Sequence, residues 1–321
     1  MPAANSYLKV YHGYGHSHNL VLYGHVFRKA LPAAIRGSRF IPNMLNLFRL
    51  FTLKPKAGIR VHLHWGEQVL ETRSEADGFF RLEWAASAGL GYGWHEVTVM
   101  LPDEPATAPV KGKVFVPHAT QYAFISDIDD TVMVSHSATL FRRLRELLFR
   151  NPATRKIFAD VARHYQLLAE AHTDEETANP FFYVSSSEWN LYDYLAQVFR
   201  KNGFPEGVFL LSQAKHWTQL LRSGKTGHSG KLLRIIRIME AFPRQQFVLM
   251  GDNSQRDPGI YAAIVQRYPG KIAAIYIRNV RKERKLAAKQ LLLGAEQAGV
   301  PICIYNKSSE AIAHSRQTGL I

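Results

Sequence analysis

The sequence predicts an α/β fold in which a parallel sheet, with helices on both faces, follows a smaller β-sandwich domain. Up to about residue 101, apolar and polar side chains alternate, as they do in half-buried strands. Four prolines fall within residues 102–117, where we place the domain boundary. Beyond it, short apolar runs alternate with stretches of helix length, which is typical of parallel strands buried on both faces.

The first domain, residues 1–117, is expected to be an antiparallel sandwich. An Asp77-Gly78 turn precedes one of its strands, and the alternating pattern predicts strands at 20–27, 59–65, 79–84 and 95–100. Residues 39–56 interrupt this pattern, because their apolar side chains recur at helical spacing. We therefore predict a helical insert there.

The second domain, residues 118–321, is expected to contain the parallel sheet. Apolar runs predict strands at 122–125, 181–184, 208–211, 247–250, 272–277 and 302–305. Helical stretches between them cover 189–201, 231–242 and 258–268. Ligands of such sheets bind just past the carboxyl ends of the strands. Residues that bind a ligand or catalyse a reaction are therefore expected at these strand ends.

Bulk composition restricts the class of protein. No apolar run is long enough to span a membrane, no secretory signal is evident, and the single Cys303 lies in an apolar strand pattern. These features predict a cytoplasmic protein. The formal charge of +14 attracts nucleic acid, anionic lipid surfaces or phosphorylated substrates, without choosing among them.

Carboxylates follow two of the predicted strands. The first strand ends in Asp127-Ile128-Asp129-Asp130-Thr131, where Asp127 and Asp129 point the same way in an extended chain. A later strand ends in a turn with Asp252 and Asp257. Carboxylates this close repel unless a cation lies between them, and hard oxygen ligands suit Mg²⁺. A magnesium site at this edge of the sheet is the resulting prediction.

Phosphate-binding groups occur in the same part of the chain. Ser185, Ser186 and Ser187 end a second strand and offer donors to a phosphate, while Lys231 opens a predicted helix and adds a positive charge. Together with the carboxylates, these groups suit phosphoryl transfer, in which a carboxylate attacks phosphorus and a second one donates a proton to the leaving oxygen.

Three blocks of sequence, residues 124–131, 182–192 and 247–261, resemble the catalytic domain of the actin-patch phosphatidate phosphatase family, a branch of the haloacid-dehalogenase-type phosphatases. The resemblance implies a Rossmann-like sheet with a helical cap at about 133–178. It implies Asp127 as nucleophile, Asp129 as general acid and base, and Mg²⁺ held by Asp127, Asp129, Asp252 and Asp257. Thr131, Ser185, Ser186 and Lys231 would bind substrate. The β-rich half resembles the domain that precedes this region in bacterial members.

The sequence departs from the family pattern at three positions. Glu188 replaces a usual proline and Gly259 a usual glutamate, which changes the rim of the site. Gly230 replaces the histidine that usually precedes the lysine, so Lys225 stays an alternative to Lys231.

Structural roles compete with several of these assignments. Asp257 before Pro258 could serve as a helix N-cap, and Ser186 and Ser187 suit that role better than ligand binding. The histidines lack partners at metal-ligand spacing, so we interpret them as packed or surface groups. Arginines within residues 142–150 form a basic amphipathic pattern that could contact a membrane, although such a face is more often solvated.

The function expected from the sequence is Mg²⁺-dependent hydrolysis of a phosphomonoester through an aspartyl-phosphate, with phosphatidate as the substrate that the resemblance implies. The expected partner is thus an anionic lipid, with a peripheral membrane contact as a further hypothesis and nucleic acid disfavoured. Two alternatives stay open: a phosphatase for a soluble ester, and a basic adaptor that uses the fold only as a scaffold to bind lipid or nucleic acid.

Overall fold

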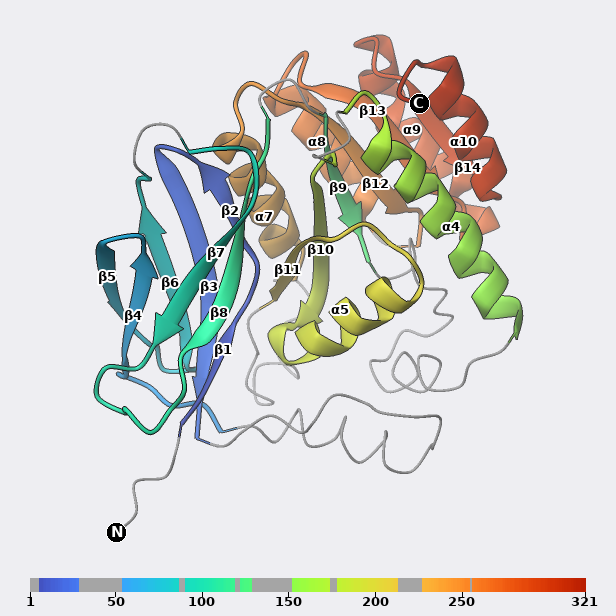
Figure 1. Cartoon of the computed structure of the whole chain (residues 1–321). Coiled ribbons are helices and arrows are strands. Elements are labelled where there is room, and N and C mark those ends of the chain that lie inside the picture. The colour runs from blue at the N-terminus through green and yellow to red at the C-terminus, as the bar shows by residue number, and fades with distance from the viewer. Residues whose placement is uncertain are drawn as a thin grey trace. The chain divides into compact units, whose positions relative to one another are not determined.

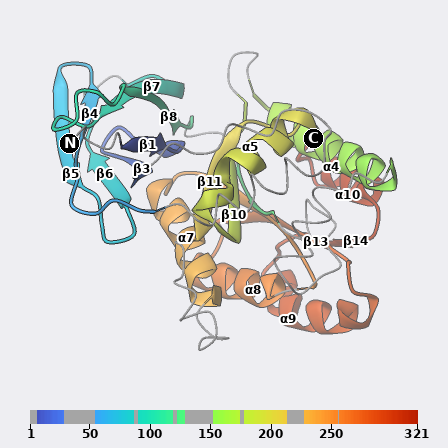
Figure 2. The same cartoon turned by 90° about the horizontal axis from the view of Figure 1, so that it is seen from below.

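The computed structural model describes residues 6–28, 54–86, 90–118, 122–128, 152–173, 178–212, 227–254 and 256–321. The chain divides into two compact units, each built around its own sheet (Figures 1 and 2). The first unit holds the described residues up to 118 together with residues 188–195. Most of the remaining described residues form the second unit.

The sheet of the first unit has eight strands: β1 (Tyr7–Val10), β2 (Gly13–His16), β3 (Asn19–Phe27), β4 (Arg60–Trp65), β5 (Gln68–Arg73), β6 (Phe79–Trp84), β7 (Gly93–Met100) and β8 (Val110–Val116). Their order is β1-β3-β2-β8-β7-β4-β5, and β6 pairs with β3. The described pairs are antiparallel except for β2 and β8, which are parallel. The sheet is therefore mixed, whereas the sequence predicted an antiparallel one, and its sandwich arrangement stays a prediction.

Alternation of side chains builds the core of the first unit. In β4, Val61 and Leu63 are fully buried, while Arg60, His62 and His64, which alternate with them, are only partly buried. Strand β3 is buried on both faces from Leu20 to Phe27. One face contributes Leu20 and Leu22 to the apolar core, and on the other Tyr23 and His25 pack among aromatic rings that include Trp189. Aromatic packing thus covers the face that simple alternation would leave exposed.

Six strands form the sheet of the second unit: β9 (Tyr122–Asp127), β10 (Phe181–Glu188), β11 (Gly207–Ser212), β12 (Gln246–Asp252), β13 (Ile272–Arg278) and β14 (Ile302–Tyr305). Their order is β11-β10-β9-β12-β13-β14, and the registered pairs are parallel. The predicted α/β class with a parallel sheet is confirmed. The order along the chain reverses between β9 and β12, where sheets of this kind bind ligands. The haloacid-dehalogenase-type arrangement stays a prediction.

Helices cover both faces of this sheet. The described helical elements are α4 (Pro152–Glu170), η1 (Trp189–Leu191), α5 (Tyr192–Lys201), α7 (Gly227–Ala241), α8 (Asp257–Arg267), η2 (Lys282–Arg284), α9 (Lys285–Gln297) and α10 (Ser308–Gln317). Figure 2 shows α4 and α10 on one face and α7, α8 and α9 on the other. Among the described residues, no helix is long and apolar enough to cross a bilayer.

The described part of α4, which lies within the predicted cap, packs on the sheet, because Tyr165 bonds to Ser126 of β9 and stacks on Phe181 of β10. Most of the predicted helical insert and residues 133–151 of the predicted cap lie outside the described residues. The proline-containing segment 102–117 was interpreted as a boundary, yet it contains β8, whose lysines interrupt the apolar pattern.

Candidate active site

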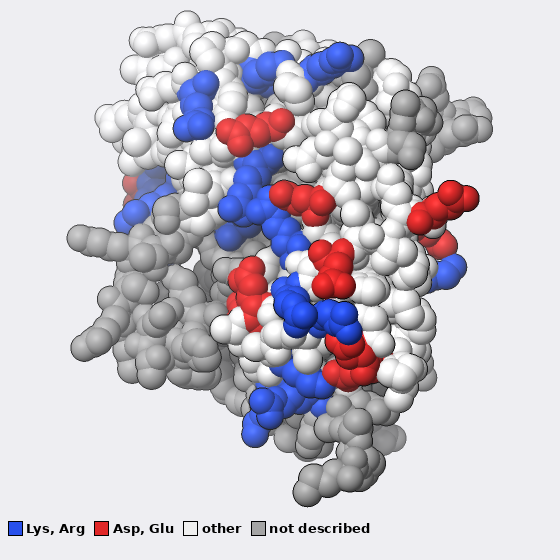
Figure 3. Space-filling view, turned by 90° about the vertical axis from the view of Figure 1, so that its left-hand side faces the viewer, with Lys and Arg blue, Asp and Glu red and all other residues white. Residues whose placement is uncertain are grey.

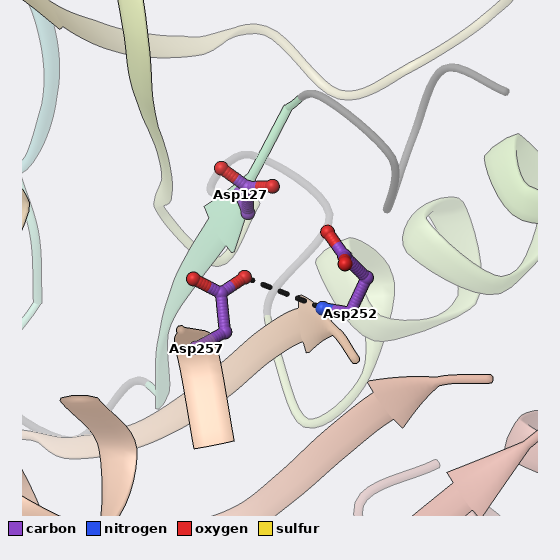
Figure 4. Close-up of side chains that lie close together, drawn as sticks. All are labelled: Asp127, Asp252 and Asp257. Carbon is purple, nitrogen blue, oxygen red and sulfur yellow. Dashed lines mark hydrogen bonds between the residues drawn. The ribbon is translucent and has the colours of Figure 1, made fainter. Parts of the chain in front are cut away.

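Three carboxylates converge at the carboxyl ends of β9 and β12. Asp127 is the last residue of β9, Asp252 is the last residue of β12, and Asp257 is the first residue of α8. One oxygen from each lies within 4.8 Å of the others, and Figure 4 shows the three side chains pointing toward a common space. The family resemblance implied that these three residues lie together, whereas Asp129, which the sequence pattern paired with Asp127, lies outside the described residues.

The sheet register and one glycine bring these carboxylates together. Asp127 lies opposite Val184 of β10, and its neighbour Ser126 lies opposite Met250 of β12. A Cβ at Gly251 would lie 2.5 Å from an Asp257 oxygen and 2.8 Å from the Tyr261 hydroxyl. Only glycine therefore lets α8 approach the strand this closely.

Two hydrogen bonds fix the start of α8 on β12. The backbone N–H of Asp252 donates to Asp257 Oδ2 at 3.3 Å (Figure 4), and the Tyr261 hydroxyl donates to the carbonyl of Met250 at 2.8 Å. The N-cap of α8 is Arg256, so the N-cap role that we considered for Asp257 is wrong. Its carboxylate instead faces the other two acids.

Lys231 forms ion pairs with two of these carboxylates. Its Nζ lies 2.8 Å from Asp127 Oδ1 and also pairs with Asp257 Oδ1. Lys231 is 3% exposed, and the three acids are at most 1% exposed. Helix α7 begins at Gly227, which places Lys231 in its second turn rather than its first, but the side chain still reaches the strand ends.

The pKa values of these groups show that the cluster lacks positive charge. Burial, together with Asp127 and Asp257, raises the pKa of Asp252 to about 8. Burial also raises the pKa of Asp257 to about 6, because it outweighs the opposite effect of Lys231. Burial alone would lower the pKa of Lys231, but Asp127 and Asp257 hold that pKa above its ordinary value. One lysine therefore does not balance three buried carboxylates.

The donor set fits a hard divalent cation. Both oxygens of Asp127 are buried and accept no hydrogen bond of regular geometry from the described residues, although Lys231 lies within ion-pair distance of one of them. Buried acceptors without donors are costly, and a cation among the three carboxylates would satisfy them. Carboxylate oxygens are ligands that Mg²⁺ prefers, so the cluster is compatible with that ion.

The serines near the carboxyl end of β10 take different positions. Ser185 is fully buried; its Oγ accepts a hydrogen bond from the backbone N–H of Ser187 at 2.9 Å. Ser186 is exposed. Strand β10 extends to Glu188, so the N-cap role considered for Ser186 and Ser187 is wrong. Ser185 follows the residue that is registered with Asp127, which puts it beside the carboxylates.

Arg234 is a site residue that sequence reasoning missed. Its guanidinium donates to the carbonyl of Ser185 at 3.1 Å, while its buried Nε has no hydrogen-bond partner among the described residues. Burial and Arg237 lower the pKa of Arg234 to about 10, although the nearby Asp127 has the opposite effect. Arg234 follows Lys231 by three positions and so shares its helical face, a spacing that could have revealed it.

The remaining predicted site residues lie outside the described part of the chain. These are Asp129, Asp130, Thr131 and the alternative lysine Lys225. Two of the histidines interpreted as packed or surface groups are described in β4. His62 contacts Glu71, and His64 contacts the sulfur of Met100.

Comparison with known proteins matches one segment of the chain, which contains this site, to a family. Residues 122–279 match the family described as "Phosphatidate phosphatase APP1, catalytic domain". This segment belongs to that catalytic-domain family. The match contains all the described residues of the carboxylate cluster, as well as Lys231, Ser185 and Arg234.

Two fungal relatives support the assignment. "Phosphatidate phosphatase APP1" of Saccharomyces cerevisiae is 27% identical over 184 residues, which are 57% of this chain and 30% of the yeast protein. "Uncharacterized protein C29B5.04c" of Schizosaccharomyces pombe is 24% identical over 164 residues, which are 50% of this chain and 26% of that protein. The matched region thus spans less than a third of either relative.

One solved structure aligns with most of this chain, at low similarity. A carbohydrate acetylesterase from Xanthomonas citri aligns with 96% of this chain and 71% of its own, at 10% identity and a TM-score of 0.33. Similarity at this level supports no conclusion about fold or function.

Proposed function

We propose that this protein is a Mg²⁺-dependent phosphatase that hydrolyses a phosphomonoester, with phosphatidate as its substrate. The observation that carries the proposal is the buried triad of Asp127, Asp252 and Asp257, in which both Asp127 oxygens lack a regular hydrogen-bond donor among the described residues. An aspartate with free lone pairs beside a cation site is suited to attack phosphorus. Membership of the matched segment in a phosphatidate phosphatase catalytic-domain family supports the same reaction.

In the proposed reaction, an oxygen of Asp127 forms a bond to phosphorus while the bond from phosphorus to the ester oxygen breaks. The leaving oxygen takes a proton from Asp129, the general acid implied by the family resemblance. Water then attacks the aspartyl-phosphate, Asp129 accepts its proton, and inorganic phosphate and free Asp127 are released. Atoms and charge balance over the two steps, and no co-reactant other than water is needed.

Lys231 and Arg234 supply positive charge to this reaction. Lys231 Nζ touches both Asp127 and Asp257, so it lies where it can contact a phosphoryl oxygen. Arg234 donates a hydrogen bond to the carbonyl of Ser185, and its Nε has no hydrogen-bond partner within the described part of the chain, which suits it to the same phosphoryl group. We assign Ser185 and Thr131 to phosphate binding and Ser186 to the rim of the site.

Mg²⁺ would be held by Asp127, Asp252 and Asp257, together with the backbone carbonyl of Asp129. When bound, it would neutralise charge that develops on the phosphoryl oxygens. The chain's own contribution is to hold these acids close together, through Gly251 and the hydrogen bond from the backbone of Asp252 to Asp257.

The domain organisation is part of the proposal. We assign residues 118–321 to the phosphatase domain, with a cap within residues 133–178, and residues 1–117 to a β domain. The protein would act in the cytoplasm, at a membrane surface where its lipid substrate lies.

The test is phosphate release from phosphatidate in mixed micelles, with Mg²⁺ and with a chelator, beside a soluble phosphate ester. Asp127→Asn is the variant. Asp103→Asn is its matched control, because Asp103 is an exposed carboxylate paired with Arg60. Mg²⁺-dependent release from the lipid, kept in the control and lost in Asp127→Asn, is expected. Release only from the soluble ester would refute the lipid substrate, and release that survives in Asp127→Asn would refute the nucleophile.

A further inference from the structure

Exposed leucines and basic side chains lie together on the segment that follows β13. Three of the exposed large hydrophobic side chains among the described residues belong to α9: Leu286 is 76% exposed, Leu291 54% and Leu293 48%. Burying apolar area of this kind is favourable, so an exposed group of leucines on one helix indicates a contact surface.

Helical geometry puts basic and apolar groups on one face of α9. Leu286 and Leu293 are seven positions apart, and the exposed Lys289 lies between them at spacings of three and four. The opposite face is buried through Ala288, Leu292 and Ala295, which anchor the helix to the rest of the unit. We call the exposed groups Lys282, Leu286, Lys289 and Leu293 the η2–α9 surface.

This surface lies in a strongly basic stretch. Between residues 278 and 293 the only acidic residue is Glu283, and the basic residues are Arg278, Arg281, Lys282, Arg284, Lys285 and Lys289. The face of the molecule in Figure 3 differs, because Lys and Arg there lie among Asp and Glu. Few acidic residues therefore lie near the basic residues of this stretch in the sequence. The resulting positive charge favours an anionic partner.

Hydrogen bonds join this basic stretch to the candidate active site. Asn253, the residue after Asp252, accepts from the backbone N–H groups of Val280 and Arg281 at 2.8 and 2.9 Å, and its amide donates to the carbonyl of Arg281 at 2.7 Å. Arg284 donates to the carbonyl of Ser254 at 2.6 Å. The segment that leads into α9 is thus fixed to the loop that positions a carboxylate of the triad.

We infer that the η2–α9 surface docks on an anionic lipid bilayer, an inference that rests on the proposed lipid substrate. Leu286 and Leu293 would enter the boundary between headgroups and acyl chains, while Lys282 and Lys289 meet lipid phosphates. Binding there would bring the strand ends that hold Asp127 and Asp252 to the membrane. This assigns the membrane contact to η2 and α9 rather than to the basic pattern within residues 142–150.

The leucines favour a bilayer over nucleic acid. A nucleic-acid site needs positive charge for phosphates and commonly uses aromatic or hydrogen-bonding side chains for bases. Exposed aliphatic side chains at helical spacing add nothing to such a site, whereas they add affinity for a bilayer.

The experiment is co-sedimentation of the full chain with vesicles of phosphatidylserine and phosphatidylcholine, and with vesicles of phosphatidylcholine alone. These vesicles contain no phosphatidate, so binding is measured apart from turnover. The test variant is Leu286→Ser with Lys289→Ala. The matched control is Val69→Ser with Lys111→Ala, which removes one exposed hydrophobic and one exposed lysine from the first unit.

The wild type is expected to bind the anionic vesicles, less so at high salt, and the test variant to bind at least about tenfold more weakly, from the combined loss of apolar and ionic contacts. The control should bind within about twofold of the wild type, since its changes lie outside the surface. Hydrolysis of a soluble ester and the melting temperature should be unchanged in both variants. Turnover without vesicle binding, equal binding by the test variant, or binding only to a DNA duplex would overturn the docking inference. Vesicle binding without turnover of any ester would instead refute the proposed phosphatase.

Discussion

Charged side chains are arranged differently in the two units. In the first unit, the pairs of Arg60 with Asp103 and of Lys111 with Glu96 lie in solvent on the sheet surface. In the second unit, Lys231 and three carboxylates are buried together at the strand ends. Exposed pairs contribute little to stability because water and salt screen them, whereas buried charges lose their hydration on folding.

This difference indicates what each set of charges is for. The surface pairs consist of one cation and one anion each, which is a stable arrangement in water. The buried cluster places three acids against Lys231, and it raises the pKa of both Asp252 and Asp257. A cluster selected only for stability would not contain such an excess of acids, so we interpret it as a site prepared for a cation and a phosphoryl group.

The largest expected effect is on turnover. Asp127→Asn should lower kcat by at least about 10⁴-fold, because the amide cannot form the aspartyl-phosphate. Its free energy of unfolding without Mg²⁺ should not fall, since the change removes one of the crowded charges. Phosphate release and urea unfolding check both results. If the variant kept a tenth of the wild-type activity, Asp127 would not be the nucleophile. If it unfolded more readily than the wild type, the charge of Asp127 would stabilise the fold.

Removing the buried cation should have the next largest effect. Lys231→Met leaves Asp127 and Asp257 without their ion pair and should lower the free energy of unfolding by about 3–5 kcal/mol. Saturating Mg²⁺ should restore part of this loss, because a bound cation replaces the missing charge. Urea unfolding with Mg²⁺ and with a chelator measures both the loss of stability and its restoration. Equal stability of the wild type and the variant under both conditions would show that Lys231 does not balance the cluster.

A glycine pair tests whether geometry, as well as charge, defines the cluster. Gly251→Ala pushes the Asp257 carboxylate away from β12 and should lower turnover by roughly 10²-fold, the usual cost of moving a reactive group by about 1 Å. The matched control is Gly259→Ala in α8, where a Cβ meets nothing within 4 Å. This control should keep full activity and gain up to about 1 kcal/mol of stability. Similar activity in the two variants would contradict the close approach at Gly251.

Buried histidines extend the comparison to pH. Burial, aided by His314, lowers the pKa of His164 in the second unit to about 3, and burial lowers the pKa of His25 in the first unit to about 4. Both are neutral when folded, so the stability they contribute is complete above the unfolded pKa of about 6.5 and is lost as the pH falls below it. Between pH 7 and pH 5, each should cost its unit about 2 kcal/mol.

The variants His164→Asn and His25→Asn should remove that loss, each in its own unit. The side chain of His164 contacts Ser315 Oγ at 2.9 Å and that of His25 contacts the Tyr11 hydroxyl at 3.0 Å, contacts that an amide can partly replace. Thermal unfolding at pH 7 and pH 5 measures the difference. If the stability of a variant fell between pH 7 and pH 5 as much as that of the wild type, the replaced histidine would take up its proton in the folded state as it does in the unfolded chain.

The smallest expected effect belongs to a surface pair. Arg60→Ala removes the partner of Asp103, and both groups lie in solvent. The urea midpoint and the phosphatase activity should match those of the wild type within experimental error, because water screens such a pair. A clear loss of stability would mean that the surface charges of the first unit also act structurally.

Sequence patterns predicted most of the second sheet because its strands are buried on both faces. The apolar runs that include Phe124 and Leu249 coincide with β9 and β12, and the acids after them converge as expected. In the first unit, β5 has no apolar face, since its residues are largely exposed, and it could not be recognised by alternation. Strand β2 has only four residues, two of them glycines, so no pattern can develop in it.

The site was predictable where chemistry depends on residue type at a strand end, and less so where it depends on packing. The sequence allows Asp257 to be either a metal ligand or a helix N-cap, because a carboxylate before proline suits both roles. Its contacts with Lys231 and with the backbone of Asp252 distinguish the two. Arg234 and Asn253 looked like ordinary polar residues of a helix and a turn. Their roles depend on partners far away in the sequence, at Ser185 and at residues 280 and 281.

The register of the parallel sheet also bears on how the site arises during synthesis. Asp127 leaves the ribosome 130 residues before Asp257, and β9 needs β12 beside it before the triad exists. A nascent chain that stops before α8 therefore cannot gain stability from a cation held by all three acids. On the proposed function, metal binding would therefore stabilise only chains in which β9 and β12 have already paired.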